Sequence, residues 1–198
     1  MRPGDPPTLE NAQEYLVSQL FDPQRYNLQE VGRYKLNQRM QINVPMSIRT
    51  ITKDDFAALV RRMIHTSADF DYLRTVRFHP RAIEAGLEAI RAGKSVITDT
   101  DMARAGIRRG ELDTFGVAVT CRMADPEVAR IAAQTATTRA RAAVDAALET
   151  MAGGIYVVGN APTALLRLVE LIKEGRARPA LVVGLPVGFV NAAESKQA

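Results

Sequence analysis

The sequence predicts an α/β protein with a mostly parallel sheet and helices on both faces, preceded by a helical or irregular N-terminal segment. Three observations support this fold class. From Pro80 onward, short apolar runs alternate with helical stretches at the spacing of βαβ units. Two of these runs end in turns that contain Gly and Pro, at residues 159–162 and 184–186, as strands of an open parallel sheet do before a helix. The first 50 residues are polar, rich in Asn and Gln, and lack this alternation.

Two helices are expected in the N-terminal part of the chain. The first covers residues 11–21 and ends at Asp22 and Pro23. The second begins at Thr52, and its apolar residues recur at the spacing of one buried helical face. These residues are Phe56, Leu59, Val60, Met63 and Ile64. The opposite, polar side of the same helix carries Arg61, Arg62 and His65.

The remaining elements follow in chain order from the apolar periodicity. Strands are expected over residues 95–98, 117–120, 155–158 and 180–183. Helical stretches are expected over residues 82–92, 126–151 and 163–175, and a last helix begins at Ala192. In the first of these helices the expected buried residues are Ile83, Leu87 and Ile90, and Gly93 ends the helix.

Composition excludes several classes of protein. Apolar residues make up 46% of the chain and charged residues 24%, which are values of a globular domain. A single cysteine, Cys121, excludes an internal disulfide framework and is interpreted as a small buried apolar residue. No apolar run reaches about 18 residues, and the N-terminus lacks the apolar core of a signal peptide. A cytoplasmic protein with no membrane partner is therefore expected.

The net charge of +4 is a mild excess that is spread along the chain and comes mostly from arginine. Such a charge suits nucleic acid, and it equally suits a small polyanion held by guanidinium groups. With no Trp and 6% aromatic residues, base stacking has few side chains to use. Nucleic acid is therefore the less favoured of the two partners.

Only two histidines, His65 and His79, can supply imidazole acid–base chemistry. His65 falls near the C-terminal end of its predicted helix, where the helix dipole favours a positive charge and Arg61 and Arg62 oppose it. It is either an acid–base group or an exposed histidine at a helix end, and spacing alone favours the second. His79 precedes Pro80 and is interpreted as a boundary residue.

Charged residues near the ends of the predicted strands suggest an anion pocket. Asp99 and Asp101 could bind a divalent cation, but no further ligands complete such a site, and a helix-capping role for Asp101 is preferred. The helices after Gly159 and Gly188 offer free N–H groups to an anion. Four basic residues would add positive charge to this pocket, although each alone is also typical of a solvated surface: Arg139, Arg141, Arg167 and Lys196.

Several longer motifs occur in one order between Val60 and Ala198. They include Arg62-Met63-Ile64-His65-Thr66, Ala68-Asp69-Phe70, Thr98-Asp99, Thr137-Thr138-Arg139, Gly159-Asn160-Ala161-Pro162-Thr163, Gly184-Leu185-Pro186-Val187-Gly188 and Ala193-Glu194-Ser195-Lys196. Together they resemble the precorrin-8X methylmutase family of cobalamin biosynthesis. The two turns that contain Gly and Pro are the most specific part of this resemblance.

The resemblance implies an isomerase that moves a methyl group between adjacent ring carbons of precorrin-8X and gives hydrogenobyrinate or its cobalt form. It implies that His65 gives and takes the proton that assists the rearrangement, and that Arg62 contacts the substrate. Arg139, Asn160 and Lys196 are expected to bind the carboxylates around the ring. The expected partner is a corrinoid small molecule, no cofactor or bound metal is needed, and the family forms homodimers.

A second set of motifs comes before the first. Arg2-Pro3-Gly4-Asp5-Pro6-Pro7, Leu20-Phe21-Asp22-Pro23, Val31-Gly32-Arg33-Tyr34 and Arg49-Thr50-Ile51-Thr52 resemble the β subunit of bacterial RNA polymerase. We therefore expect a polymerase-like segment over residues 1–55 and a methylmutase-like domain over 56–198, truncated at its C-terminus relative to the family. The alternative function is a catalytically inactive fusion or fragment that only binds a corrinoid, or that associates with nucleic acid as a piece of polymerase.

Overall fold

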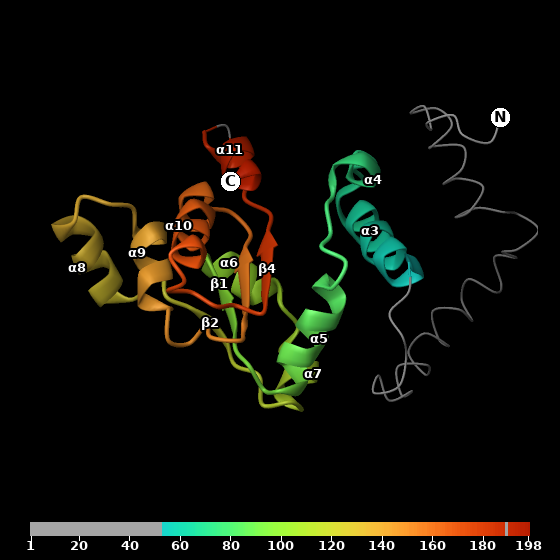
Figure 1. The fold of residues 1–198 in the computed structure, drawn as a ribbon, viewed down its shortest axis with the longest axis horizontal. Helices are drawn as coiled ribbons and strands as arrows, with labels where there is room; N and C mark the ends of the chain where they lie inside the picture. Colours follow the sequence, from blue (N-terminus) through green and yellow to red (C-terminus); the bar gives the residue numbers. More distant parts are fainter. Residues whose placement is uncertain (1–52, 189) are drawn as a thin grey trace, which may run out of the picture. The chain divides into compact units, whose positions relative to one another are not determined.

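The computed structural model describes residues 53–188 and 190–198 (Figure 1). The chain divides into two units, Met1–Arg77 and Phe78–Ala198. The helix expected over residues 11–21 lies outside the described residues. Within them, no helix is both long enough and apolar enough to cross a membrane.

In the first unit, the described residues form helix α3 (Lys53–Ser67) and the short helix α4 (Tyr72–Thr75). Helix α3 confirms the helix predicted to begin near Thr52. Of its expected apolar face, Ile64 is buried and Phe56, Val60 and Met63 are half-buried, whereas Leu59 is exposed. The helix ends where Ala68 adopts a positive φ of 57° while its N–H still bonds the Ile64 carbonyl.

The second unit contains a four-stranded sheet in the order β2-β1-β3-β4, and all neighbouring strands are parallel. The strands are β1 (Val96–Thr98), β2 (Val119–Cys121), β3 (Ile155–Val158) and β4 (Leu181–Gly184). The central strands β1 and β3 are largely buried, and the outer strands β2 and β4 are half-buried. This arrangement confirms the predicted α/β class with a parallel sheet.

Strand β2 begins two residues later than predicted. The backbone N–H of Val117 donates to the carbonyl of Leu112, which belongs to the helix before the strand, and Gly116 in the intervening turn has a positive φ of 68°. Val117 is buried, which explains its strand-like appearance in the sequence, but its N–H is used by the turn and not by the sheet.

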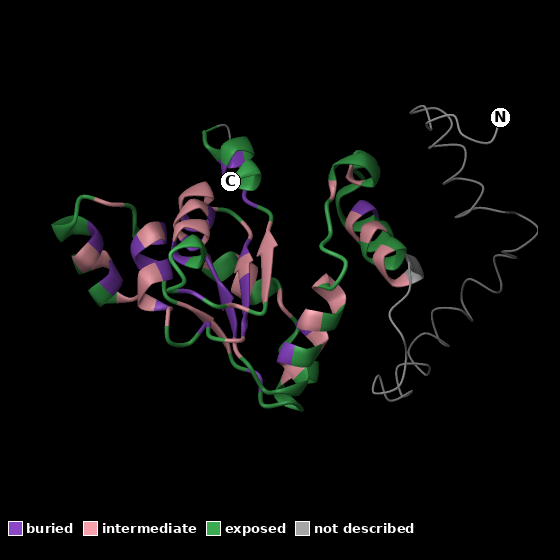
Figure 2. Ribbon diagram, in the orientation of Figure 1, coloured by how far each residue is buried: buried purple, intermediate pink, exposed green. Residues whose placement is uncertain are grey.

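Helices lie on both faces of the sheet (Figures 1 and 2). The helices of this unit are α5 (Ala82–Arg91), α6 (Asp101–Gly106), α7 (Arg109–Asp113), α8 (Pro126–Gln134), α9 (Arg139–Ala146), α10 (Pro162–Lys173) and α11 (Ala192–Gln197). On one face, Ile97 and Tyr156 pack with α9 and α10 around Val144, Leu168 and Leu171. On the other face, Val96 and Ile155 pack with Ala89 of α5. The side chains of adjacent strand residues thus pack into the apolar cores on opposite faces of the sheet.

Helix α5 packs closer to the sheet than its sequence suggests. Its buried residues are Gly86 and Ala89, whereas the expected Ile83, Leu87 and Ile90 are only half-buried. A Cβ on Gly86 would lie 3.0 Å from Cδ2 of Leu181, so the missing side chain permits the close approach. The smallest residues therefore face the sheet and the larger ones flank them.

The Ala-rich stretch over residues 126–151 forms two helices, α8 and α9, instead of one continuous helical region. Between them Ala136 has a positive φ of 51°, and the Thr138 hydroxyl accepts a hydrogen bond from the Arg141 N–H at 3.2 Å. Thr138 thereby caps a new helix. Ala142 and Ala143 of α9 pack against Val128 and Ala132 of α8, so the small side chains bury the contact between the two helices.

Candidate functional site

The carboxyl ends of the parallel strands lie at one edge of the sheet. We call the segments that follow β1, β3 and β4 at this edge the binding edge. The two turns singled out in the sequence, 159–162 after β3 and 184–186 after β4, are neighbours there. The Leu185 N–H donates to the Val158 carbonyl at 2.8 Å, and the Val187 N–H donates to the Asn160 carbonyl at 3.1 Å. The two turns therefore act as one bonded unit at the edge where ligands of open α/β sheets bind.

Asp99, directly after β1, determines the shape of the first turn. Its carboxylate accepts backbone hydrogen bonds from Gly159 at 2.9 Å, Asn160 at 2.9 Å and Ala161 at 2.6 Å. The residue is only 1% exposed. The N–H groups of the turn that leads into α10 (Pro162–Lys173) are thus already bonded to an internal carboxylate and are not free for an anion.

Asp101 does not take the capping role preferred for it. The hydroxyl of Thr100 caps α6 by accepting from the Ala103 N–H at 3.3 Å, and Asp101 pairs with Arg104 at 2.7 Å. The alternative role in cation binding also lacks ligands, because no group of three or more His, Cys, Asp or Glu among the described residues could hold a metal ion. Cys121, at the end of β2, is half-buried and unpaired with any other cysteine.

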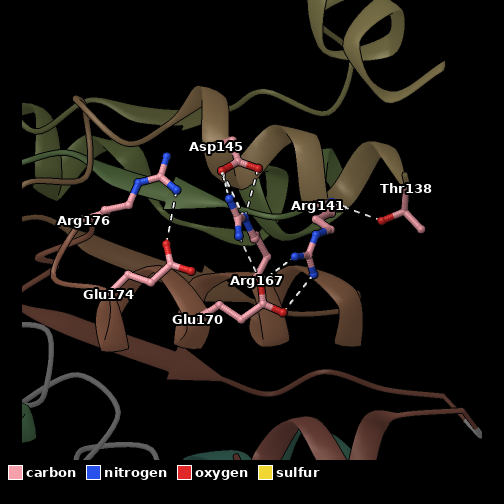
Figure 3. Close-up of polar contacts among 7 residues, drawn as sticks. All are labelled: Thr138, Arg141, Asp145, Arg167, Glu170, Glu174 and Arg176. Carbon is pink, nitrogen blue, oxygen red and sulfur yellow. Dashed lines mark hydrogen bonds and ion pairs between the residues drawn. The ribbon is translucent and has the colours of Figure 1, made fainter. Parts of the chain in front are cut away.

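The expected basic residues fall into two groups. Arg141 and Arg167 are held in an ion-pair cluster between α9 and α10 (Figure 3). Arg167 pairs with Asp145 at 2.7 Å and with Glu170 at 3.0 Å, and Arg141 pairs with the same Glu170. These bonds raise the pKa of Arg167, and the largest cause is the hydrogen bonding that Arg167 donates to Asp145. The positive charges of both guanidinium groups are thus balanced by carboxylates within the fold. Both arginines therefore connect α9 and α10. The prediction that they add positive charge to an anion pocket is wrong.

The three other predicted substrate-binding residues of the second unit have exposed side chains. Asn160 lies in the turn after β3, Arg139 is the first residue of α9, and Lys196 lies in the last turn of α11. Of these, Asn160 belongs directly to the binding edge, since its carbonyl bonds Val187.

The binding edge also carries exposed apolar side chains that the sequence analysis missed. Met102 follows β1, and Leu185, Val187 and Val190 follow β4; their exposed fractions range from 45% to 74%. These side chains follow β1 and β4, which β3 separates in the sheet, and large apolar side chains so exposed are available to contact a ligand. The sequence did contain a signal for them, because large apolar residues occur there at positions where turns usually carry polar ones.

In the first unit, helix α3 presents Arg62 and His65 at its exposed side. The two residues are three positions apart, so they lie on the same side of the helix, and His65 is in the last turn as predicted. His79, by contrast, accepts a hydrogen bond through Nδ1 from the Arg81 N–H at 3.2 Å, which agrees with its interpretation as a boundary residue.

The family model for precorrin-8X methylmutase matches residues 39–198, which is most of the chain. The chain belongs to the precorrin-8X methylmutase family. The cobalt-precorrin-8 methylmutase of Priestia megaterium is 47% identical over 144 residues, which cover 73% of this chain and 64% of the relative. The Salmonella typhimurium relative of the same name is 46% identical over 142 residues, or 71% of this chain and 66% of that protein. The chain thus spans less than two thirds of these methylmutases.

Solved structures agree with this family. A crystal structure of precorrin-8x methyl mutase from Thermus thermophilus superposes with a TM-score of 0.67 and 45% sequence identity. The match covers 83% of this chain and 80% of that one. A structure described as a precorrin-8X methylmutase related protein gives a TM-score of 0.64 at 31% identity, over 70% of this chain and 72% of the other. The fold of the methylmutase family is therefore present.

A second family model, RNA polymerase Rpb2, domain 2, matches residues 1–71. This confirms the second resemblance seen in the sequence. The two models overlap over residues 39–71, which include all of helix α3 with Arg62 and His65.

Proposed function

We propose that this chain is a methylmutase that moves a methyl group between adjacent ring carbons of precorrin-8X to give hydrogenobyrinate or its cobalt form. The observation that carries the proposal is the methylmutase family match over residues 39–198, which includes both the Arg62–His65 helix and the binding edge. The migrating methyl group breaks its bond to one ring carbon and forms a bond to the neighbouring carbon. The product is an isomer of the substrate, so no electrons are gained or lost.

His65 is the proposed proton donor and acceptor in this rearrangement. Its exposed side chain at the end of α3 is accessible to a ligand. A proton placed on the ring makes it more electron-poor and eases the shift of the methyl group, and the same proton returns to the imidazole afterwards. Arg62, one turn earlier on the same side of α3, is proposed to bind a substrate carboxylate.

The chemistry of a corrinoid matches the residues of the binding edge. Such a ring has broad apolar faces and carboxylates around its rim. The exposed apolar side chains Met102, Leu185 and Val187 would contact a ring face, and Asn160, Arg139 and Lys196 would bind rim carboxylates. Because the backbone N–H groups of residues 159–161 already bond Asp99, side chains and not that turn's backbone would hold the carboxylates.

An absorbance titration of the purified chain with hydrogenobyrinic acid, followed by turnover of precorrin-8X, tests the proposal. Saturable binding together with product formation is the expected result. Binding without turnover would support the alternative of a corrinoid-binding fragment without activity. Absence of both, in a protein that still melts cooperatively, would overturn the proposed function.

A second candidate function rests on the polymerase family match over residues 1–71. In this alternative the chain associates with nucleic acid as a piece of a polymerase. It predicts binding to duplex DNA that weakens steeply as salt concentration rises, because phosphate contacts release counterions. No binding to duplex DNA at low salt would eliminate it.

We further propose a cytoplasmic homodimer in which residues 1–55 form the polymerase-like segment and 56–198 the methylmutase-like domain. The single cysteine suits a reducing compartment. Light scattering coupled to size-exclusion chromatography measures the mass directly, and a monomeric mass at micromolar concentration would contradict the dimer.

A further inference from the structure

The buried carboxylate of Asp99 joins parts of the binding edge that are far apart in sequence. It lies after β1, yet all three of its backbone donors belong to the turn after β3, about 60 positions later. Three successive N–H groups converge on the two oxygens of one side chain. A carboxylate so placed fixes the direction of every peptide group in that turn.

The constraint extends to the next strand through backbone bonds. With the turn held, the Asn160 carbonyl points to the Val187 N–H at 3.1 Å, and the Val158 carbonyl points to the Leu185 N–H at 2.8 Å. Gly159 packs against α6, since a Cβ there would lie 3.3 Å from Cβ of Ala103 and 3.8 Å from Oδ1 of Asp99. The carboxylate, the first turn and the second turn therefore form a continuous chain of contacts.

We infer that Asp99 is a positioning residue for corrinoid binding: it holds Asn160 and, through the backbone bonds of that turn, Leu185 and Val187 in the orientation that receives the ring. The inference rests on the proposed function, because it concerns how the same edge binds its ligand. Asp99 itself is buried and does not touch the ligand. Its effect on binding must pass through the residues that it orients.

A double-mutant cycle separates this role from a general contribution to stability. The variants are Asp99→Asn, Asn160→Ala and the double variant, each titrated with hydrogenobyrinic acid. Asp99→Asn keeps the side-chain volume but turns an amide NH₂ toward backbone donors, so the turn must reorient. The matched control is Asp101→Asn, which changes an exposed carboxylate two positions later, paired with Arg104 outside the turn.

We expect Asp99→Asn to weaken binding at least tenfold and Asp101→Asn to leave the dissociation constant within about twofold of the wild type. The effects of Asp99→Asn and Asn160→Ala should not add, because the first acts through the second. Fully additive effects, or an unchanged dissociation constant in Asp99→Asn, would overturn the inference.

A second variant keeps the inference testable if Asp99→Asn fails to fold. Gly159→Ala retains the carboxylate but pushes the turn away from α6, and it should show the same non-additivity with Asn160→Ala. Wild-type affinity in Gly159→Ala would then overturn the inference. If the wild type itself does not bind hydrogenobyrinic acid, the proposed function fails and the inference fails with it. If the wild type binds and these variants bind equally well, the inference alone fails.

Discussion

At the scale of single residues, the chemistry of this chain depends on which polar side chains are exposed and which are already bonded. Arg62 and His65 are exposed on α3, whereas Arg141, Arg167 and Asp99 are bonded within the fold. Helical spacing alone predicted the polar side of α3 with His65 in its last turn, because α3 has a regular apolar period. The partners of Asp99 could not be predicted, because they lie in the turn after β3, about 60 positions later, and only the tertiary fold brings them together.

Replacing His65 by Asn should remove the proton donor while keeping a polar side chain of similar size. We expect turnover to fall roughly 10²–10⁴-fold, which is the usual contribution of general acid–base catalysis. Binding of hydrogenobyrinic acid should change little. The control is His79→Asn, because His79 lies outside the proposed machinery and bonds only a backbone N–H before α5. Equal turnover in the His65 variant and the wild type would remove His65 from the mechanism.

Arg62→Ala should act on substrate binding and not on the chemical step. Loss of a hydrogen-bonded charge pair costs about 1.5–3 kcal/mol, so KM should rise roughly ten- to hundred-fold while kcat changes less. Arg61→Ala, one position earlier on the same exposed side, is the matched control and should leave both constants nearly unchanged. Steady-state kinetics of the two variants measure both constants. Equal changes in KM for Arg62→Ala and Arg61→Ala would show that only the net charge of the helix matters.

At the scale of elements, the strands and most helices were predictable, because buried strands give short apolar runs between helical periods. The break between α8 and α9 was not, because alanine favours helix throughout the stretch and the capping role of Thr138 depends on its local backbone. The ion-pair cluster that joins α9 to α10 was also hidden, since Asp145 and Arg167 are 22 positions apart.

The same cluster predicts a pH dependence of stability. Hydrogen bonds from Arg141 and then Arg167 lower the pKa of Glu170 below its usual value of 4.5. A lowered pKa stabilises the folded state above the unfolded value, and this contribution is lost as pH falls through the folded value. Because the Glu170 side chain is 42% exposed, the contribution should be about 0.5–1 kcal/mol at most.

Thermal melting of the wild type and Glu170→Gln across pH 3–7 measures this contribution. The wild type should be the more stable protein near neutral pH, and the difference should shrink below about pH 4.5. Glu111→Gln changes an exposed glutamate of α7 and serves as the control. A stability difference that stays constant across the range would contradict the assigned role of Glu170.

Gly154 tests the close approach at the start of β3. A Cβ at this position would lie 2.5 Å from the Ser95 carbonyl oxygen, which is a backbone atom of the neighbouring segment and cannot rotate away. Gly154→Ala should therefore lower the free energy of unfolding by about 1–3 kcal/mol. Gly110→Ala, in α7 with open space around it, should be neutral or slightly stabilising. Denaturant titration compares the two, and equal stability would refute the packing argument.

At the scale of the whole molecule, the parallel sheet brings the carboxyl ends of its four strands to one edge, and this edge follows from the βαβ order visible in the sequence. The exposed apolar side chains at that edge were not anticipated, because Met102 and Val187 are separated in sequence and each alone is an ordinary exposed residue. The two family models overlap in α3, where one amphipathic pattern satisfies both families.

Ligand binding should stabilise the folded protein as a whole. At a hydrogenobyrinic acid concentration 100 times the dissociation constant, the expected gain is about 2.7 kcal/mol. Differential scanning calorimetry should show a melting temperature that rises with ligand concentration in the wild type and in His65→Asn alike. A melting temperature independent of ligand would contradict a preformed corrinoid-binding edge.

The three backbone bonds to Asp99 also bear on competition inside a cell. Phosphate and other small inorganic anions are abundant, and successive unbonded peptide N–H groups in a turn attract them regardless of the intended substrate. Here an anion is already supplied by the polypeptide itself. Millimolar phosphate is therefore not expected to inhibit by binding to the backbone of this turn. Discrimination between corrinoids then depends on side chains, which can change without disturbing the main chain.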